Sequence, residues 1–357
     1  MLVDNQITEY FIEHKIQDQH NLLIMGEGFD SRMCKGLECL SGFLENSEIW
    51  KIHYAEAKDS QSEAYKSLID ENIKTFNSLT KSIKTELAIL KMWTEGSEER
   101  YIAEIQATKF IKDNQGNIGI FDNVIIDISA LPQSIYYPML IKLFRDWIEK
   151  KNIFILATEN YMTDMNTHPV ELAETAHKMH GFVGTGNVAN DEGIIVWFPV
   201  LGEINPPMLQ KYYDYLQKTY SKINEICPVL PFPSVDVRRL DTIIDSYRNL
   251  IFSQWQIEKG NLIYVAENNP FQVYRKLFET ATHYDKVMKP IGKCRYVFST
   301  ITSKLMGIGT LLSSYALRDD GYSVDFLNIS NKGYMLNKSG TEISSQIYCL
   351  CMNDKGL

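Results

Sequence analysis

The sequence has no run of about eighteen uncharged apolar residues, so it offers no candidate for a membrane-spanning helix. Near its start, Asp4, Glu9 and Glu13 stand where a secretion signal would carry basic residues followed by an apolar block. These two absences predict a cytoplasmic protein with no membrane partner.

Cysteine motifs are missing as well. There is no Cys-x-x-Cys pair, and the six cysteines are scattered: Cys34, Cys39, Cys227, Cys294, Cys349 and Cys351. This spacing indicates neither a zinc ribbon nor a disulfide framework, so we expect reduced thiols. The sequence also lacks a Gly-x-Ser-x-Gly elbow and any evident Ser-His-Asp or Cys-His set. Whether the protein is an enzyme is therefore left open.

An excess of basic residues is absent too. The 357 residues include 36 Lys and Arg against 45 Asp and Glu, a net charge of −9. Non-specific binding of duplex DNA or RNA depends on clustered Lys and Arg, so no direct duplex partner is expected. With 45% hydrophobic residues the chain can bury a large core, enough for two domains or one double-length α/β unit.

Short apolar runs alternate with helix-like segments along most of the chain, which predicts parallel sheets covered by helices on both faces. The predicted strands are 21–25, 49–55, 122–129, 152–158, 194–200, 226–230, 261–266, 295–299 and 322–327. The predicted helices include 134–149, 206–224, 236–256, 270–288 and 302–318. We therefore predict an α/β fold of two tandem Rossmann-like halves: residues 1–180, a Gly-rich linker 181–193, and residues 194–357.

Three segments have less regular patterns. Apolar residues at spacings of three and four predict one or two helices over 61–95, and 112–119 is expected to be a loop or hairpin tip. A helix over 169–180 would place Glu171, Glu174, His177 and His180 on one face. Such a face can bind a divalent metal, but the His-Glu-x-x-His pattern is missing, so we expect a solvated face and no metal site.

The first candidate site follows the first predicted strand, where the chain reads Gly26-Glu-Gly28-Phe-Asp30-Ser-Arg32 and then enters a helix-like segment. Glycines leave no Cβ in the way of a tight turn, and free backbone N–H groups at a helix start can hold an anion. The full dinucleotide fingerprint has a third glycine where this chain has Ser31. The motif predicts a ligand site at Gly26, Gly28, Asp30 and Arg32 without naming the ligand.

Two further places combine polar side chains with a strand end and a helix start, where open α/β sheets place their ligands. The candidate ligand-binding residues there are Asp127 and Ser129 in the first half, and Thr300, Thr302, Ser303 and Lys304 in the second. The alternative is that Ser129, Thr302 or Ser303 simply caps a helix, which requires no ligand.

The segment 296–316 reads as an apolar strand, then Ser-Thr-x-Thr-Ser-Lys-x-Met-x-x-Gly, then a helix of small residues. It resembles the Thr-Gly-Gly-Thr-Lys-x-Met segment of CARF domains, which are Rossmann folds that also occur in tandem in the SAVED domains of prokaryotic antiphage systems. The resemblance implies a cyclic oligonucleotide ligand, with Thr300, Thr302, Ser303 and Lys304 at a phosphate or ribose. The chain departs from the pattern at Ile301 and Ser303, and the first half has Pro132 in place of the lysine.

The first glycine turn also resembles the first motif of leucine carboxyl methyltransferase-type enzymes, which use S-adenosylmethionine. Those enzymes hold the ribose hydroxyls with an acidic residue at the end of the second strand, where this chain has Glu56. A second complete α/β half is not the layout expected of a methyltransferase, so this interpretation ranks second.

Two polar clusters in the second half are weaker candidates. Arg238 and Arg239 stand at a predicted helix start and could bind a phosphate, but the flanking Asp236 and Asp241 favour intramolecular ion pairs. The sequence from Glu267 to Pro270 contains two asparagines that could contact a base or ribose, or form a turn with an asparagine cap.

Three functions remain in view. The preferred hypothesis is a nucleotide-binding sensor or regulatory component of a prokaryotic defence-type system, working with a separate effector protein. The alternatives are an enzyme that uses S-adenosylmethionine or another nucleotide, and a non-catalytic interaction subunit. The cofactor is not identified by the sequence, and self-association of the chain is left open.

Overall fold

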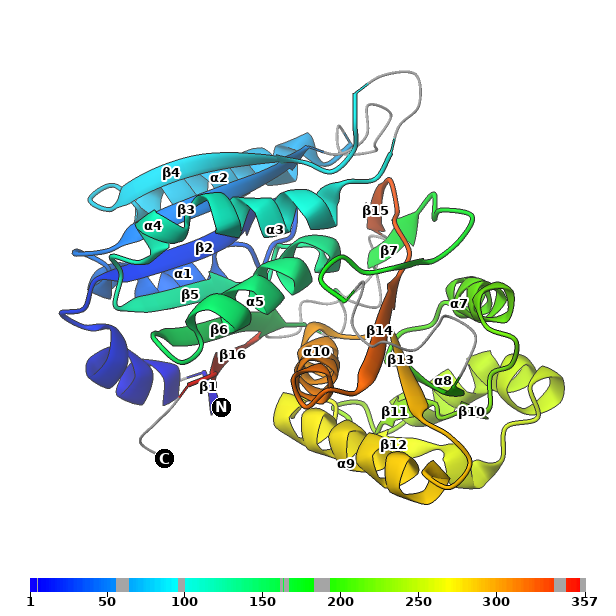
Figure 1. Ribbon diagram of the computed structural model, residues 1–357. Helices are drawn as coiled ribbons and strands as arrows, with labels where there is room; N and C mark the ends of the chain where they lie inside the picture. Colours follow the sequence, from blue (N-terminus) through cyan, green and yellow to red (C-terminus); the bar gives the residue numbers. More distant parts are fainter. Residues whose placement is uncertain are drawn as a thin grey trace. The chain divides into compact units, whose positions relative to one another are not determined.

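The computed structural model describes residues 1–4, 6–55, 64–95, 100–160, 163, 167–182, 193–336 and 345–353. It divides into two compact units (Figure 1). Unit 1 comprises residues 1–170 together with 332–357, and unit 2 comprises residues 171–331. Each unit is a Rossmann-like α/β structure built on a mixed, mostly parallel sheet, so the predicted fold class is confirmed.

The sheet of unit 1 has the order β1-β16-β6-β5-β2-β3-β4, in which β2 to β6 are parallel, β16 is antiparallel to β6, and β1 is antiparallel to β16. Its strands are β1 (Leu2–Val3), β2 (Asn21–Glu27), β3 (Glu48–Ala55), β4 (Lys84–Lys91), β5 (Asn123–Asp127), β6 (Asn152–Glu159) and β16 (Gln346–Cys351). A separate antiparallel pair joins β7 (Thr167–Val170) to β15 (Gly333–Leu336). The central strands β2 and β5 are continuous apolar runs because both faces of the sheet are covered.

Helices pack on both faces of this sheet (Figure 1). They are η1 (Ile7–Ile16), α1 (Lys35–Leu40), η2 (Ser41–Phe43), α2 (Lys66–Leu79), α3 (Ala103–Asp113), α4 (Gln115–Ile118) and α5 (Gln133–Trp147). On one face, Leu23 and Met25 of β2 pack with Phe11 of η1 and Leu37 of α1 in a buried cluster. This cluster fixes the sheet beneath the strand ends where the candidate residues lie.

The sheet of unit 2 has the order β12-β11-β9-β13-β14-β8, and β10 pairs with β9. Its strands are β8 (His177–Lys178), β9 (Ile194–Leu201), β10 (Glu225–Ile226), β11 (Val229–Pro231), β12 (Ile263–Val265), β13 (Cys294–Ile301) and β14 (Ser323–Asn328). All of them are parallel except β8. The predicted strand 226–230 is divided in two at Pro228, which cannot donate a ladder hydrogen bond.

The helices of unit 2 are α7 (Pro206–Thr219), α8 (Arg239–Arg248), η4 (Asn249–Gln254), η5 (Lys259–Asn261), α9 (Pro270–Met288) and α10 (Lys304–Asp319). Two of them begin with the same sequence signal, a capping asparagine followed by proline. Asn205 accepts from the Met208 N–H, and Asn269 accepts from the Gln272 N–H. The asparagine-cap reading of the segment ending at Pro270 is therefore confirmed for Asn269.

Three local predictions were wrong. The helical pattern over 61–95 ends at Leu79, and residues 84–91 form β4 because they pair with β3 along its whole length. Residues 112–119 complete α3 and form the short α4, with Ile118 buried. Residues 169–180 contain β7 and β8 instead of a helix, and Glu171 has φ of 49°.

The boundary between the units also differs from the prediction of a domain over 194–357. The chain returns to unit 1 after residue 331, because β15 pairs with β7 and β16 pairs with β6. The predicted linker 181–193 lies almost entirely outside the described residues. No helix within the described ranges is both long and apolar enough to cross a membrane.

Candidate ligand site

Each sheet has one position at which the strand order reverses. In unit 1 the chain passes from β2 outward through β3 and β4, then crosses to β5 and β6 on the other side. In unit 2 it passes from β9 through β11 to β12, then crosses to β13 and β14. Ligands of open α/β sheets bind outside the carboxyl ends of the strands at such a reversal. All ten candidate residues predicted from the sequence lie within or just after β2, β5 or β13.

In unit 1 the two glycines lie against the chain that follows β5. A Cβ added at Gly26 would lie 2.8 Å from Leu131 Cδ2 and 2.9 Å from the Ala130 carbonyl oxygen. A Cβ at Gly28 would lie 2.5 Å from the Tyr54 hydroxyl, which donates a 3.2 Å hydrogen bond to that same Ala130 oxygen. Gly26 is therefore required by the close approach of the Ala130 backbone, whereas a side chain at Gly28 would have to displace the end of the Tyr54 side chain.

Asp30 and Arg32 pair with each other. Arg32 donates from Nε and Nη2 to the Asp30 carboxylate at 2.9 and 2.7 Å, and its side chain is only 3% exposed. The Asn72 amide donates to the carbonyl oxygens of Gly28 and Asp30 at 2.8 and 2.9 Å. The backbone and charges of this turn are thus held by internal contacts.

The end of β5 is also held by internal hydrogen bonds, one of which joins it to the neighbouring strand β6. Asp127 Oδ1 accepts from the Ser129 N–H at 2.9 Å, and Ser129 Oγ accepts from the Thr158 N–H at 2.9 Å. Asp127 and Ser129 are 2% and 1% exposed. The Thr158 hydroxyl is enclosed on β6 and makes no hydrogen bond with a described residue. Ser129 therefore connects β5 to β6 and does not cap α5.

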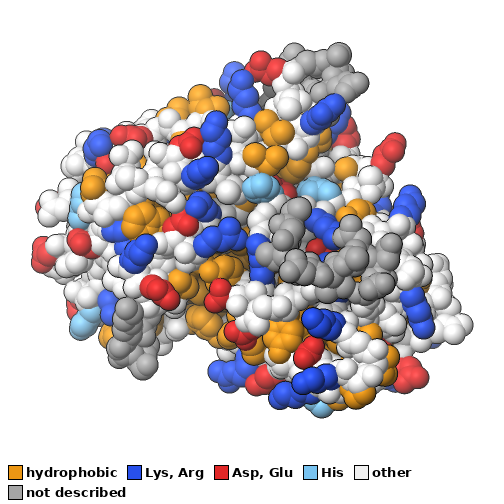
Figure 2. All heavy atoms as spheres, in the orientation of Figure 1, with side chains coloured by type: hydrophobic (Ala, Val, Ile, Leu, Met, Phe, Trp, Pro, Cys, Tyr) orange, Lys and Arg blue, Asp and Glu red, His pale blue; other side chains and the backbone are white. Residues whose placement is uncertain are grey.

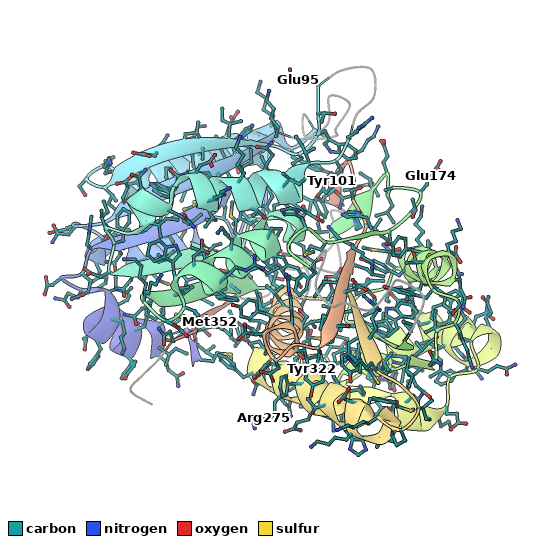
Figure 3. All side chains as sticks on the ribbon, viewed as in Figure 1. Glu95, Tyr101, Glu174, Arg275, Tyr322 and Met352 are labelled. Atoms are coloured by element: carbon teal, nitrogen blue, oxygen red, sulfur yellow. The ribbon has the colours of Figure 1, made fainter. Side chains whose placement is uncertain are left out.

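The helix that follows β5 is covered at its start. Pro132 stands at the N-cap of α5, and Ser134 in the first turn forms a hydrogen bond with Tyr101, which precedes α3 (Figure 3). Burial raises the pKa of Tyr101 far above its usual range, so the ring stays a neutral phenol. The first turn of α5 thus already has a protein partner.

A charged cluster lies beside this corner, on β2 and β3. Glu27 forms an ion pair with Lys51, and His53 Nδ1 lies 3.0 Å from Glu27 Oε1. The hydrogen bond with His53, together with the Lys51 ammonium, lowers the pKa of Glu27 to about 2. Glu27 is therefore ionised at neutral pH and acts as a fixed negative charge.

In unit 2 the corresponding corner is formed by the ends of β9 and β13. Gly202 follows β9, and a Cβ added there would overlap the Thr302 hydroxyl. Its N–H donates to the Ile301 carbonyl at 2.7 Å. Thr302 Oγ1 also lies 3.2 Å from Met306 Sδ, and Thr300 is buried within β13. The chain after β9 thus lies directly on the turn that leads into α10.

That turn ends in Ser303, the N-cap residue of the 16-residue α10. Ser303 is 5% exposed, and its hydroxyl makes no hydrogen bond with any described residue. This is unusual, because a capping serine normally accepts from a backbone N–H in the first helical turn. Lys304 follows, half buried, and forms no ion pair with a described residue. The Ser303 hydroxyl and the Lys304 ammonium, side by side at a helix start, therefore have no partner among the described residues.

Two buried charges that stand far apart in the sequence support this corner from the side. Arg239 donates to the Gly202 carbonyl at 3.1 Å from Nε and forms a 2.6 Å ion pair with Glu267. Glu267 in turn accepts from the Val235 N–H at 3.1 Å. Arg239 thus pairs within the protein, as expected, and its partner Glu267 lies 28 residues further along the chain.

Gly202 itself was missed in the sequence. The available signal is that a Gly-Glu pair marks the end of the first long strand in each unit: β2 ends in Gly26-Glu27, and β9 is followed directly by Gly202-Glu203. Because both glycines lie at a strand-order reversal, the same backbone requirement recurs in the two units.

The described residues offer binding groups more than reacting groups. No cluster of three or more His, Cys, Asp or Glu suited to a metal occurs among them. Burial raises the pKa of Cys34 and of Cys227 to about 11, so both remain thiols at neutral pH. On the face shown in Figure 2, positive and negative side chains are interspersed. Glu56 of the methyltransferase-like motif lies outside the described residues.

The comparisons with known proteins give distant structural matches and no sequence match. No family model matches the chain, and no curated protein sequence matches it. A universal stress protein from Archaeoglobus fulgidus is 10% identical, with a TM-score of 0.25, over 87% of this chain and 96% of that one. The cytoplasmic domain of a prokaryotic cation chloride cotransporter is 10% identical, with a TM-score of 0.23, over 87% and 95%. At this similarity neither protein's function transfers to the chain.

Proposed function

We propose that unit 2 binds a phosphate-bearing nucleotide at the start of α10, and that the protein is a sensor whose output is binding and not turnover. The observation that carries the proposal is Ser303, whose buried hydroxyl has no described partner although it stands at the N-cap of a long helix. Lys304 beside it is a half-buried cation with no described counter-ion.

The chemistry of this corner suits a phosphate. The first turn of a helix has backbone N–H groups without intrahelical acceptors and carries a partial positive charge, which favours an anion. A lysine adds a compact charge that pairs with phosphate oxygens. The Ser303 hydroxyl, which makes no hydrogen bond with a described residue, can donate to one of those oxygens.

The ligand class follows from the sequence resemblance. Residues 296–316 resemble the CARF segment, so the ligand that we propose is a cyclic oligonucleotide, and the role is in a defence-type system with a separate effector. Unit 1 supports this assignment to unit 2, since its glycine turn and its serine are already bonded within the protein.

Calorimetric titration with a panel of cyclic oligonucleotides, nicotinamide dinucleotide and S-adenosylmethionine tests the proposal. We expect a cyclic oligonucleotide to bind, more weakly as salt is raised. Lys304→Ala should weaken that binding by about 1.5–3 kcal/mol, the range for a hydrogen bond to a charged group. The matched control is Arg275→Ala, an exposed cation on α9 that points away from the ribbon (Figure 3), and it should leave the affinity unchanged.

Two outcomes would contradict the proposal. One is an affinity for the cyclic oligonucleotide that is the same in the native protein and in Lys304→Ala. The other is binding of S-adenosylmethionine alone, which would return the site to the glycine turn of unit 1 and favour an enzyme.

A further inference from the structure

The outer edge of β4 in unit 1 differs from the other edges of the two large sheets. β1, β8 and β12, the other edge strands, are two or three residues long, whereas β4 has eight residues. It lies at the margin of the sheet beyond β3 (Figure 1), and no described strand pairs with its outer side. A long, regular edge strand exposes a row of unpaired backbone N–H and C=O groups to another chain.

The side chains of β4 do not protect this edge. Leu87 and Ile89 point to the same face of the sheet and are 58% and 63% exposed. The terminal lysines, which could repel a second strand, are neutralised within the chain: Lys84 pairs with Glu48 at 2.8 Å, and Lys91 pairs with Glu95 at 2.7 Å. The middle of the strand is therefore apolar and nearly neutral.

We propose that β4 pairs with β4 of a second copy of this chain, antiparallel, so that two unit 1 sheets join into one continuous sheet. In such a pair, residues directly opposite each other point to the same face of the joined sheet. The registers that satisfy this condition differ from one another by a shift of two residues along the partner strand. The register centred on Ala88 places Leu87 opposite Ile89 twice, and Thr85 opposite Lys91. The exposed apolar side chains then form one four-residue cluster across the junction.

This register fits better than its neighbours. With Leu87 at the centre, Ile89 would face Thr85, and with Ile89 at the centre, Leu87 would face Lys91. A centre at Glu86 would place two carboxylates directly opposite each other, which is destabilising. The strand is thus self-complementary about Ala88, and this is why a second copy is the occupant that we propose. The proposal does not depend on the ligand site.

Sedimentation velocity over a range of protein concentrations, without ligand, tests the association. We expect the native chain to form a dimer, and Leu87→Lys combined with Ile89→Lys to weaken self-association at least a hundredfold. The matched control is Ile120→Lys, because Ile120 is also 63% exposed but lies outside β4. It should dimerise like the native chain. A native chain that stays monomeric, or a double variant that still dimerises, would overturn the proposal.

Cysteine substitution tests the register. Opposed residues of an antiparallel pair have Cα atoms about 4.5–5.5 Å apart, within the range for a disulfide. Ala88→Cys should therefore cross-link to itself under mild oxidation, beyond the background of the native chain. Leu87→Cys and Ile89→Cys should cross-link only when the two variants are mixed. Self-cross-linking of either one alone would overturn the register, even if the chain proves to be dimeric.

Discussion

The two strand-order reversals share a topology but differ in how their polar groups are used. At the unit 1 corner, Arg32 is paired with Asp30, and Ser129 holds the backbone of the neighbouring strand. At the unit 2 corner, the Ser303 hydroxyl and the Lys304 ammonium lack a described partner. The same fold thus produces one corner whose serine and arginine have partners within the protein and one whose serine and lysine have no described partner, so topology alone does not identify a binding site.

The strongest way to test the internal role of the unit 1 corner is Asp30→Ala. It removes the carboxylate that pairs with an arginine only 3% exposed, so we expect unit 1 to lose about 3–5 kcal/mol, the usual cost of breaking a buried ion pair. Native-state hydrogen exchange at β2 amides measures unit 1, and β9 amides report on unit 2 as the control. If unit 1 kept its stability and ligand affinity fell, Asp30 would belong to a binding site.

Alanine at the two glycines gives a matched pair. At Gly26 the new Cβ would press on the Ala130 backbone, and at Gly202 on the Thr302 side chain. Each variant should destabilise its own unit by about 1–3 kcal/mol, as for overpacking elsewhere. Only Gly202→Ala should also lower nucleotide affinity in a titration. An equal loss of affinity in Gly26→Ala would mean that both corners contact the ligand.

Acid should affect unit 1 through Glu27. Its pKa in the folded state is about 2, below the ordinary value of 4.5, so its ion pair stabilises unit 1 above about pH 4.5 and is lost as the pH falls toward 2. Glu27→Gln should remove roughly 1–2 kcal/mol near neutral pH, allowing for solvent screening, and flatten the acid dependence. Hydrogen exchange or urea unfolding at pH 6 and pH 3 measures this, and an unchanged pH profile would rule out this role for Glu27.

The last comparison is between the two serines, one of which should cost almost nothing to remove. Ser129→Ala should cost unit 1 about 1–3 kcal/mol, because it leaves the buried Thr158 N–H without an acceptor. Ser303→Ala should cost unit 2 almost nothing, although a capping serine is usually worth about 1 kcal/mol. Thermal unfolding of the two variants compares them directly. A full capping loss in Ser303→Ala would show that its hydroxyl is bonded in the free protein.

Much of the fold could be predicted because buried parallel strands are continuous apolar runs. β9 and β13 are buried along their whole length, and the prediction placed both within a few residues. β4 was missed because Leu87 and Leu90 also fit a helical spacing, and only pairing with β3 decides between the two. The return of β16 to β6 joins residues far apart in the chain, a contact that local patterns do not contain.

The sequence predicted where the candidate site residues lie, but not which groups they pair with. Sequence patterns located Ser129 and Ser303 at strand ends, but identical residue types there have opposite surroundings. The partner of Ser129 is the backbone of β6, and Arg239 finds its partner in Glu267 beyond β12. These contacts depend on which strands become neighbours, and this follows from the topology and not from the local sequence.

The antiparallel pair of β7 and β15 has a consequence for how the chain is made. Residues 171–331 depart from unit 1 after Val170 and rejoin it at Lys332, whose N–H donates to the Val170 carbonyl. During synthesis all of unit 2 is therefore made before β16 emerges to pair with β6. Unit 2 can then fold before the sheet of unit 1 is complete. Both ends of unit 2 meet at the pair of β7 and β15. We therefore expect that unit 2 can be excised and the two strands joined by a short turn, leaving unit 1 to fold by itself.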